Sequence, residues 1–200
     1  MSRRLVVRSQ LPHVEKGGVL DDCGPSSAAC AVSWVLGSDV TAAEGIAAKK
    51  KATGAPDRDG VSDNGSSLSQ LAKTVRELGA RCEYPNSWEE ATAAAKNGAA
   101  LIINVQAAFG YPAQALSKWH RNWHKYWTKK DAAVAAAGYG HMVTVSFDPA
   151  IGWQLADPTF SGEGKERFAV AVTAQDVRAI ASSKGDAPHK RVLIVERRKV

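Results

Sequence analysis

The chain has 200 residues, of which 44% are hydrophobic, and its formal net charge at pH 7 is +6. This size and composition suit a single buried domain, which we place at residues 1–196, with residues 197–200 expected to begin a linker to further domains. Three widely spaced cysteines without a CxxC pair argue against a disulfide framework or a zinc ribbon.

The N-terminus is charged and lacks the apolar core of a signal peptide, and no apolar run is long enough to span a bilayer. We therefore expect a protein that is made in the cytoplasm without a signal peptide and has no membrane partner. The basic excess favours an acidic partner such as nucleic acid, anionic lipid or an anionic cell-wall polymer. Because the basic residues are spread over several segments, we expect no specific nucleic-acid partner, and we expect a monomer.

The first predicted elements are a strand at residues 5–8, a loop at 10–22 and an Ala-rich helix that opens at Cys23. Pro25 fits the first turn of this helix because its fixed φ is already helical. Asp21 or Asp22 can serve as the N-cap, and Gly37 is expected to end the helix.

Three further helices are predicted before the sheet. Thr41-Ala42-Ala43-Glu44 is a capping-box pattern for a helix that should fray over residues 49–54, and Ser87-Trp88-Glu89-Glu90 is a second one. Between them, apolar residues at helical spacing after Ser66 or Ser67 predict the third helix.

Apolar runs rich in branched residues predict the strands of the second half. We place them at residues 100–105, 141–147, 152–156, 167–172 and 191–196, with a helix at 173–182 before the last strand. Helices first and an antiparallel sheet second is an α+β arrangement.

Cys23 is the candidate nucleophile. It stands where a helix begins, and the unpaired backbone N–H groups and partial positive charge of such a terminus stabilise a thiolate. The alternative is a small buried core residue. Cys30, in the middle of the same helix, and Cys82, in an apparent strand, lack this setting.

His141 and Asp157 are the candidate partners of this thiol. His141 begins one predicted strand, and Asp157 ends the neighbouring strand sixteen positions later (157 − 141). Across a hairpin the two ends lie side by side, so Asp157 can hold one ring nitrogen while the other faces a thiol. Each residue alone also fits a structural role, as a strand-end histidine or an Asp-Pro turn.

Four motifs occur in this order: Asp22-Cys23-Gly24-Pro25-Ser26-Ser27, Gly65-Ser66-Ser67-Leu68, Gly140-His141-Met142-Val143-Thr144-Val145 and Asp157-Pro158. With them the chain resembles papain-like cysteine peptidases of the bacteriocin-leader-peptidase type, and within these the N-terminal peptidase domains of mycobacteriophage endolysins (lysin A). The resemblance implies a papain-like α+β fold, in which N-terminal helices carry the nucleophile and pack on a C-terminal antiparallel β-sheet. It implies Cys23 as the nucleophile, His141 as the general base and acid, Asp157 as the orienting residue, and no cofactor.

The resemblance also concerns the oxyanion hole. The family usually has a glutamine about six positions before the cysteine, but position 17 here is glycine. The segment before Gln10 resembles the one that carries that glutamine, so Gln10 is expected to fill the role across a longer loop, with the Cys23 backbone N–H as the second donor.

Substrate binding is expected at Ser66 and Ser67, and at Trp123 and Lys125 of a segment at residues 116–130 that is rich in aromatic and basic residues. Its tryptophans suit either packing or a platform for glycan or nucleic acid. Its two histidines have i,i+4 spacing but lack the glutamate of a zincin, so no metal site is expected.

The sequence therefore favours a cysteine endopeptidase that acts on the cell wall, hydrolysing peptidoglycan stem peptides as the catalytic domain of a phage endolysin in host cell lysis. One alternative is a peptidase for leader peptides or other protein substrates, although leader peptidases are normally joined to a membrane transporter. The other is a catalytically silent module that binds cell wall or nucleic acid through its basic face.

Overall fold

The computed structural model describes residues 2–10, 22–54, 66–106, 140–159, 167–183 and 187–198. These residues form a six-stranded antiparallel sheet with the strand order β1-β6-β2-β3-β4-β5. The strands are β1 (Arg81–Glu83), β2 (Ala100–Gln106), β3 (Gly140–Asp148), β4 (Gly152–Ala156), β5 (Val170–Val172) and β6 (Val192–Glu196).

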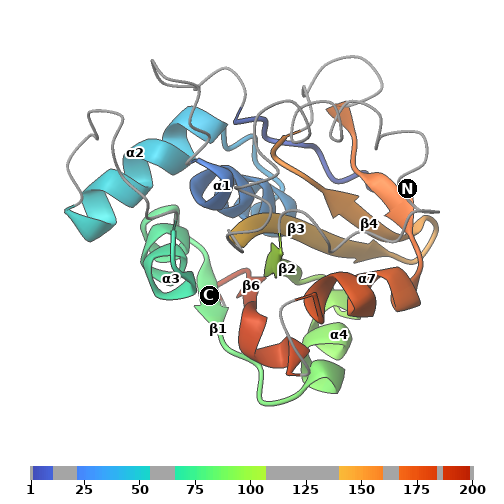
Figure 1. Cartoon of the computed structure of the whole chain (residues 1–200). Coiled ribbons are helices and arrows are strands. Elements are labelled where there is room, and N and C mark those ends of the chain that lie inside the picture. Colours follow the sequence, from blue (N-terminus) through green and yellow to red (C-terminus); the bar gives the residue numbers. More distant parts are fainter. Residues whose placement is uncertain are drawn as a thin grey trace, which may run out of the picture.

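Helices cover both faces of the sheet (Figure 1). One face packs against α1 (Cys23–Leu36), beside which lie α2 (Ala42–Thr53) and α3 (Leu68–Glu77). The other face packs against α4 (Trp88–Lys96) and α7 (Ala174–Ala181), and a short 3-10 helix, η3 (Pro188–Arg191), precedes β6. This is the α+β fold that the sequence predicts.

Two hydrophobic cores result, one on each face of the sheet. Ala100 and Ile102 of the central strand β2 join α1 and α3 in the first core, whereas Leu101 and Ile103 join α4 and α7 in the second. The alternation follows from the two-residue period of a strand. Because both faces are covered, β2 reads in the sequence as a continuous apolar run rather than as an alternating one.

Small residues make α1 the buried helix of the fold. All of its residues from Cys23 to Trp34 are buried, and alanine, serine and glycine predominate among them. Small side chains let the helix backbone approach the sheet and α2 closely. Gly37 ends the helix in the left-handed conformation with φ 72°, as predicted.

The prediction of a strand at residues 5–8 is wrong. Residues 5–8 run beside β4 and β5 but form only one isolated bridge, between Val6 and Phe168. The backbone N–H of Leu5 donates to Oε1 of the Gln154 side chain at 3.0 Å rather than to a strand carbonyl, so no regular ladder develops. Residues 167–169 bond to this N-terminal segment, so the β4–β5 ladder begins only at Val170 rather than at residue 167.

The helix termini follow the local capping chemistry. Thr41 and Ser67 form complete capping boxes at the starts of α2 and α3. The predicted fraying of α2 over residues 49–54 is wrong, because the helix continues to Thr53 and Gly54 closes it in the left-handed conformation. No helix in the described ranges has both the length and the apolar character needed to cross a membrane.

Candidate active site

Cys23 is the first residue of α1, and its side chain is buried. Asp22 occupies the N-cap position but its side chain makes no capping hydrogen bond, and no acidic residue lies in the first turn. Cys23 thus has the setting that the sequence predicts for a nucleophilic thiol.

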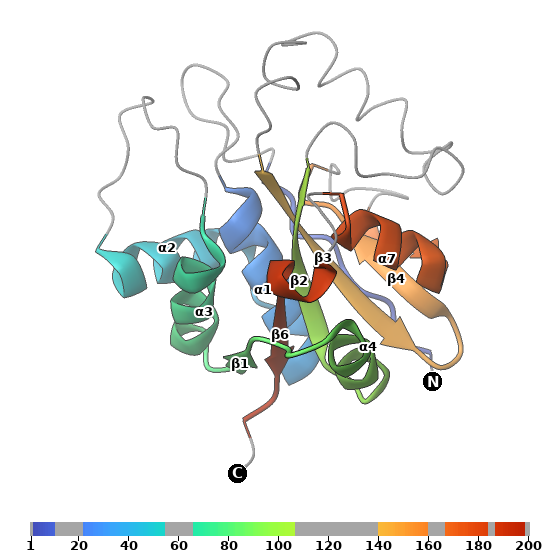
Figure 2. The same ribbon diagram turned by 60° about the horizontal axis from the view of Figure 1, so that its bottom comes forward.

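Two hydrogen bonds lock the first turns of α1 onto β3, close to His141. Ser27 Oγ donates to the carbonyl oxygen of Met142 at 3.0 Å, and Thr144 Oγ1 donates to the carbonyl oxygen of Ser27 at 2.9 Å. Both bonds are buried, so each resists exchange with water. Figure 2 shows that α1 and β3 begin at the same end of the sheet. Cys23 is the first residue of α1 and His141 the second residue of β3.

His141 and Asp157 form a buried hydrogen-bonded pair. The distance between His141 Nε2 and Asp157 Oδ1 is 2.8 Å, and the side chains are 3% and 1% exposed. The strand register pairs Thr144 with Ala156, so continuing it by one residue puts Asp157 diagonally across from His141. The hairpin therefore brings the two residues together as the sequence predicts.

Thr159 also holds the Asp157 carboxylate, at the same oxygen that His141 contacts. Asp157 Oδ1 accepts hydrogen bonds from the Thr159 backbone N–H at 2.8 Å and from Thr159 Oγ1 at 2.7 Å. Such donors favour the ionised carboxylate and fix its orientation. Thr159 is not predicted from the sequence, although a threonine two positions after an aspartate is a recognisable signal for an Asx-type turn.

The second partner of the His141 imidazole is Cys23. Burial is the largest single influence on the pKa of His141 and lowers it, but the charge and hydrogen bond of Asp157, together with the hydrogen bond and charge of Cys23, raise the pKa to about 10. Because Asp157 engages Nε2, the ring nitrogen that remains for Cys23 is Nδ1. The imidazole therefore bridges the thiol and the carboxylate, and it retains its proton at neutral pH.

Gln10 lies beside the segment that carries Asp157. Its backbone N–H donates at 2.9 Å to the carbonyl oxygen of Pro158, the residue after Asp157. Its side chain is 1% exposed, and neither the amide oxygen nor the amide nitrogen has a hydrogen-bond partner among the described residues. A buried amide without partners is costly, which makes it a candidate group for binding a ligand.

The remaining predicted substrate-binding residues have different placements. Ser66 is buried against Gly24, and its hydroxyl has no partner in the part of the chain that the structure describes. Ser67 is exposed, and its hydroxyl accepts the Gln70 backbone N–H as the N-cap of α3. Trp123 and Lys125 lie outside the described residues.

The other two cysteines have structural settings. Cys30 Sγ contacts the carbonyl oxygen of Val6 at 3.1 Å, and Cys82 Sγ contacts that of Ala72 at 3.3 Å. Burial raises the pKa of Cys30 to about 12 and raises that of Cys82 as well. A thiol that stays protonated is a poor nucleophile. Within the ranges covered by the structure, no three His, Cys, Asp or Glu residues are grouped so that they could hold a metal ion.

The fold is similar to a known one. A crystal structure of a proposed C39-like peptidase from Bacillus anthracis matches this chain with a TM-score of 0.53, covering 99% of this chain and 100% of the other. The two sequences are 15% identical, so the match concerns the fold. It confirms the predicted α+β, papain-like fold. No protein-family model matches the sequence, and no curated protein shows significant similarity to it.

Proposed function

We propose that the protein is a cysteine peptidase in which Cys23 is the nucleophile, His141 the general base and acid, and Asp157 the orienting residue. The observation that carries this proposal is the buried His141 imidazole, which is hydrogen-bonded to Asp157 at 2.8 Å and also to Cys23. A nucleophilic thiol requires a base beside it, and the base requires a third group that fixes its tautomer. The similarity of the fold to a proposed peptidase supports the same function.

In the proposed reaction, the sulfur of Cys23 attacks the carbonyl carbon of the scissile amide as a thiolate, with the protonated imidazole of His141 beside it. The carbonyl oxygen becomes an oxyanion that accepts hydrogen bonds from the Cys23 backbone N–H and from the Gln10 side-chain amide. The C–N bond then breaks, the imidazolium proton passes to the leaving amine, and a thioester remains on Cys23.

Water completes the proposed cycle. The neutral imidazole takes a proton from the attacking water, a second oxyanion forms at the same two donors, and the C–S bond breaks to release the carboxylic acid. The thiolate and the imidazolium are then restored. Throughout, Asp157 keeps Nε2 protonated, so that Nδ1 is the atom that exchanges protons.

We propose peptidoglycan stem peptides as the substrate. Two features of the sequence support this choice: the resemblance to endolysin peptidase domains and the net charge of +6, which suits an anionic wall polymer. The role that follows is cell-wall hydrolysis during release of phage from its host.

The test is digestion of purified peptidoglycan followed by mass spectrometry of the new amino termini. We expect wild type to release one kind of terminus and Cys23→Ala to release none, while Cys82→Ala serves as the matched control. Cleavage of an unrelated protein such as casein, with no new termini in peptidoglycan, would support the peptidase activity and contradict peptidoglycan as the substrate. Failure of wild type to hydrolyse any peptide or thioester substrate would contradict the proposal that the protein is a peptidase.

A further inference from the structure

The segment of residues 2–10, which we name the N-terminal strap, leads directly to the Gln10 amide. From this arrangement we infer that Arg8 is a positioning residue for Gln10: it anchors the end of the strap to α1 and thereby sets where the amide lies relative to Cys23. The inference rests on the oxyanion-hole role proposed above for Gln10.

The Gln10 side chain has no anchor of its own among the described residues, since both of its amide atoms lack hydrogen-bond partners there. An oxyanion donor is effective only when it is held in place before the reaction. The position of this amide must therefore come from packing and from the backbone of the residues that precede it. Those residues are the last part of the strap.

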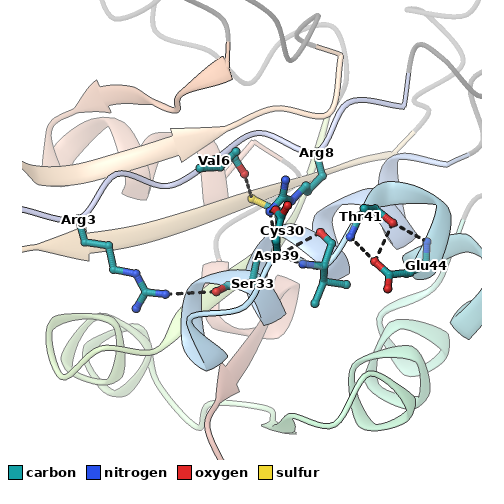
Figure 3. A network of polar contacts seen from close by, with 9 residues as sticks. Arg3, Val6, Arg8, Cys30, Ser33, Asp39, Thr41 and Glu44 are labelled. Atoms are coloured by element: carbon teal, nitrogen blue, oxygen red, sulfur yellow. Dashed lines mark hydrogen bonds and ion pairs between the residues drawn. The ribbon is translucent and has the colours of Figure 1, made fainter.

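Arg8 supplies a charged anchor for that part of the strap (Figure 3). Arg8 Nη2 donates to Ser33 Oγ of α1 at 3.2 Å and pairs with the Asp39 carboxylate, which follows α1. The Arg8 side chain is 15% exposed, whereas that of Asp39 is 84% exposed. An ion pair with so exposed a carboxylate contributes little to the free energy of unfolding. We therefore expect loss of the Arg8 side chain to change the position of the strap more than the stability of the fold.

The anchor on the helix side is itself well fixed. Ser33 Oγ donates to the carbonyl oxygen of Val40 at 3.1 Å and accepts the Val40 backbone N–H at 3.0 Å. With Arg8 as the second donor, this hydroxyl uses its one proton and both lone pairs. The residue after Val40 is Thr41, the N-cap of α2. Arg8 thus contacts the junction between α1 and α2, as the labelled side chains in Figure 3 show.

The strap is held on the opposite side by the segment that carries Asp157. Both Ser9 Oγ, at 3.5 Å, and the Gln10 backbone N–H, at 2.9 Å, donate to the carbonyl oxygen of Pro158. The contact of Arg8 with the nucleophile helix and the contacts of Ser9 and Gln10 with Pro158 therefore come from neighbouring residues. We expect a shift at Arg8 to displace Gln10, and small displacements of an oxyanion donor lower the rate strongly.

The test is a double-mutant cycle between Arg8 and Gln10, measured as kcat/KM on soluble muropeptides prepared from purified peptidoglycan. We expect Arg8→Ala to lower kcat/KM by about tenfold in the wild-type background and by less than about twofold in the Gln10→Ala background. The loss is expected in kcat rather than KM, because the oxyanion forms only along the reaction. An equal loss in both backgrounds would show that Arg8 does not act through Gln10 and would overturn the inference.

Two further variants sharpen the comparison. Arg8→Lys keeps the charge but replaces the planar guanidinium, whose Nη2 meets both Ser33 and Asp39, by an ammonium on a flexible stem, so we expect it to restore only part of the rate. Arg4→Ala is the matched control, because Arg4 belongs to the same strap but is exposed and stacks over the ring of Phe168 at 5.3 Å. It should leave kcat/KM unchanged, and a loss equal to that of Arg8→Ala would contradict a specific role for Arg8.

A readout that is independent of hydrolysis separates this inference from the proposed function. The side-chain amide of Gln10 gives a pair of NMR signals that can be assigned by their disappearance in Gln10→Ala. We expect these signals to shift or broaden in Arg8→Ala and to stay in place in Arg4→Ala. Unchanged signals in Arg8→Ala would contradict the positioning role of Arg8. Changed signals, in a protein whose wild type shows no hydrolytic activity, would support the positioning role and contradict only the proposed peptidase function.

Discussion

His141 Nε2 lies 2.8 Å from Asp157 Oδ1, and the two residues come from the beginning of β3 and from the position just after β4. We expect His141→Ala to lower kcat/KM more than Asp157→Ala does, by roughly one to two orders of magnitude, because the histidine carries the proton while the aspartate fixes its ring. Asp157→Asn should keep part of the activity. Steady-state kinetics on the three variants checks this order, and negligible effects of both Asp157 changes would place the orienting residue elsewhere.

The three cysteines should respond differently to replacement by alanine. Cys23→Ala is expected to lower hydrolysis by more than about 10³-fold while the fold is kept, since alanine is tolerated at a helix start. Cys30→Ala removes a partly buried contact with Val6 and should lower stability while leaving the chemical step in place. Activity assays paired with thermal unfolding distinguish the two outcomes. Full activity of Cys23→Ala together with an inactive but folded Cys30→Ala would reassign the nucleophile.

The His141–Asp157 pair also predicts how stability depends on pH. The pKa of His141 is raised from 6.5 to about 10, so the folded chain binds this proton more tightly than the unfolded chain. The resulting stabilisation is fully present below pH 6.5 and is lost as the pH rises through about 10. We expect the free energy of unfolding, measured by urea denaturation, to fall over this window.

Asp157→Asn is the control for the pH experiment, because it removes the carboxylate that raises the pKa of His141. Other groups that titrate over the window are common to both proteins, so the difference between the two curves isolates the pair. The fall should be smaller in the variant, and the alkaline limb of its kcat/KM profile should move to lower pH. Parallel curves would mean that the pair does not link protonation to folding.

Local patterns explain why much of the site could be predicted from the sequence. Cys23 was identified by a Gly-Pro helix start, and His141 and Asp157 by a hairpin whose turn fixes their spacing. The grip of Arg8 on Ser33 joins residues 25 positions apart, and no periodicity or cap signals such a contact. Similarly, the Gln154 side chain replaces a strand partner for Leu5, which explains why β-like residues at 5–8 do not form a strand.

The basic residues at 116–130 remain a prediction from sequence, since this segment lies outside the described residues. Charge reversal at Lys125, Lys129 and Lys130 should weaken binding to cell-wall sacculi at low ionic strength, because attraction between a basic surface and an anionic polymer is screened by salt. Thermal stability should change little. A sacculus pull-down over a salt series measures the effect, and identical curves for wild type and the triple variant would assign substrate recognition elsewhere.

Gly45 of α2 packs directly against the first turn of the nucleophile helix. A Cβ placed on Gly45 would lie 2.4 Å from the carbonyl oxygen of Pro25 and 3.1 Å from Ala29 Cβ. Replacing glycine by alanine inside a helix ordinarily stabilises it by about 1 kcal/mol. Here the Pro25 carbonyl oxygen belongs to the backbone and cannot rotate aside. Overpacking costs about 1–3 kcal/mol, so we expect alanine at this position to destabilise the protein instead.

We therefore expect Gly45→Ala to lower the midpoint of thermal unfolding and also to lower kcat/KM, because relief of the clash moves Pro25 and with it Cys23, two residues earlier. Ala47→Gly is the matched control: Ala47 is exposed on the same helix, so glycine there should cost about 1 kcal/mol through helix propensity alone and leave kcat/KM unchanged. Differential scanning calorimetry and steady-state kinetics on both variants measure the two effects. A Gly45→Ala protein that is more stable than wild type and fully active would show that α2 can move away from α1 without disturbing the thiol.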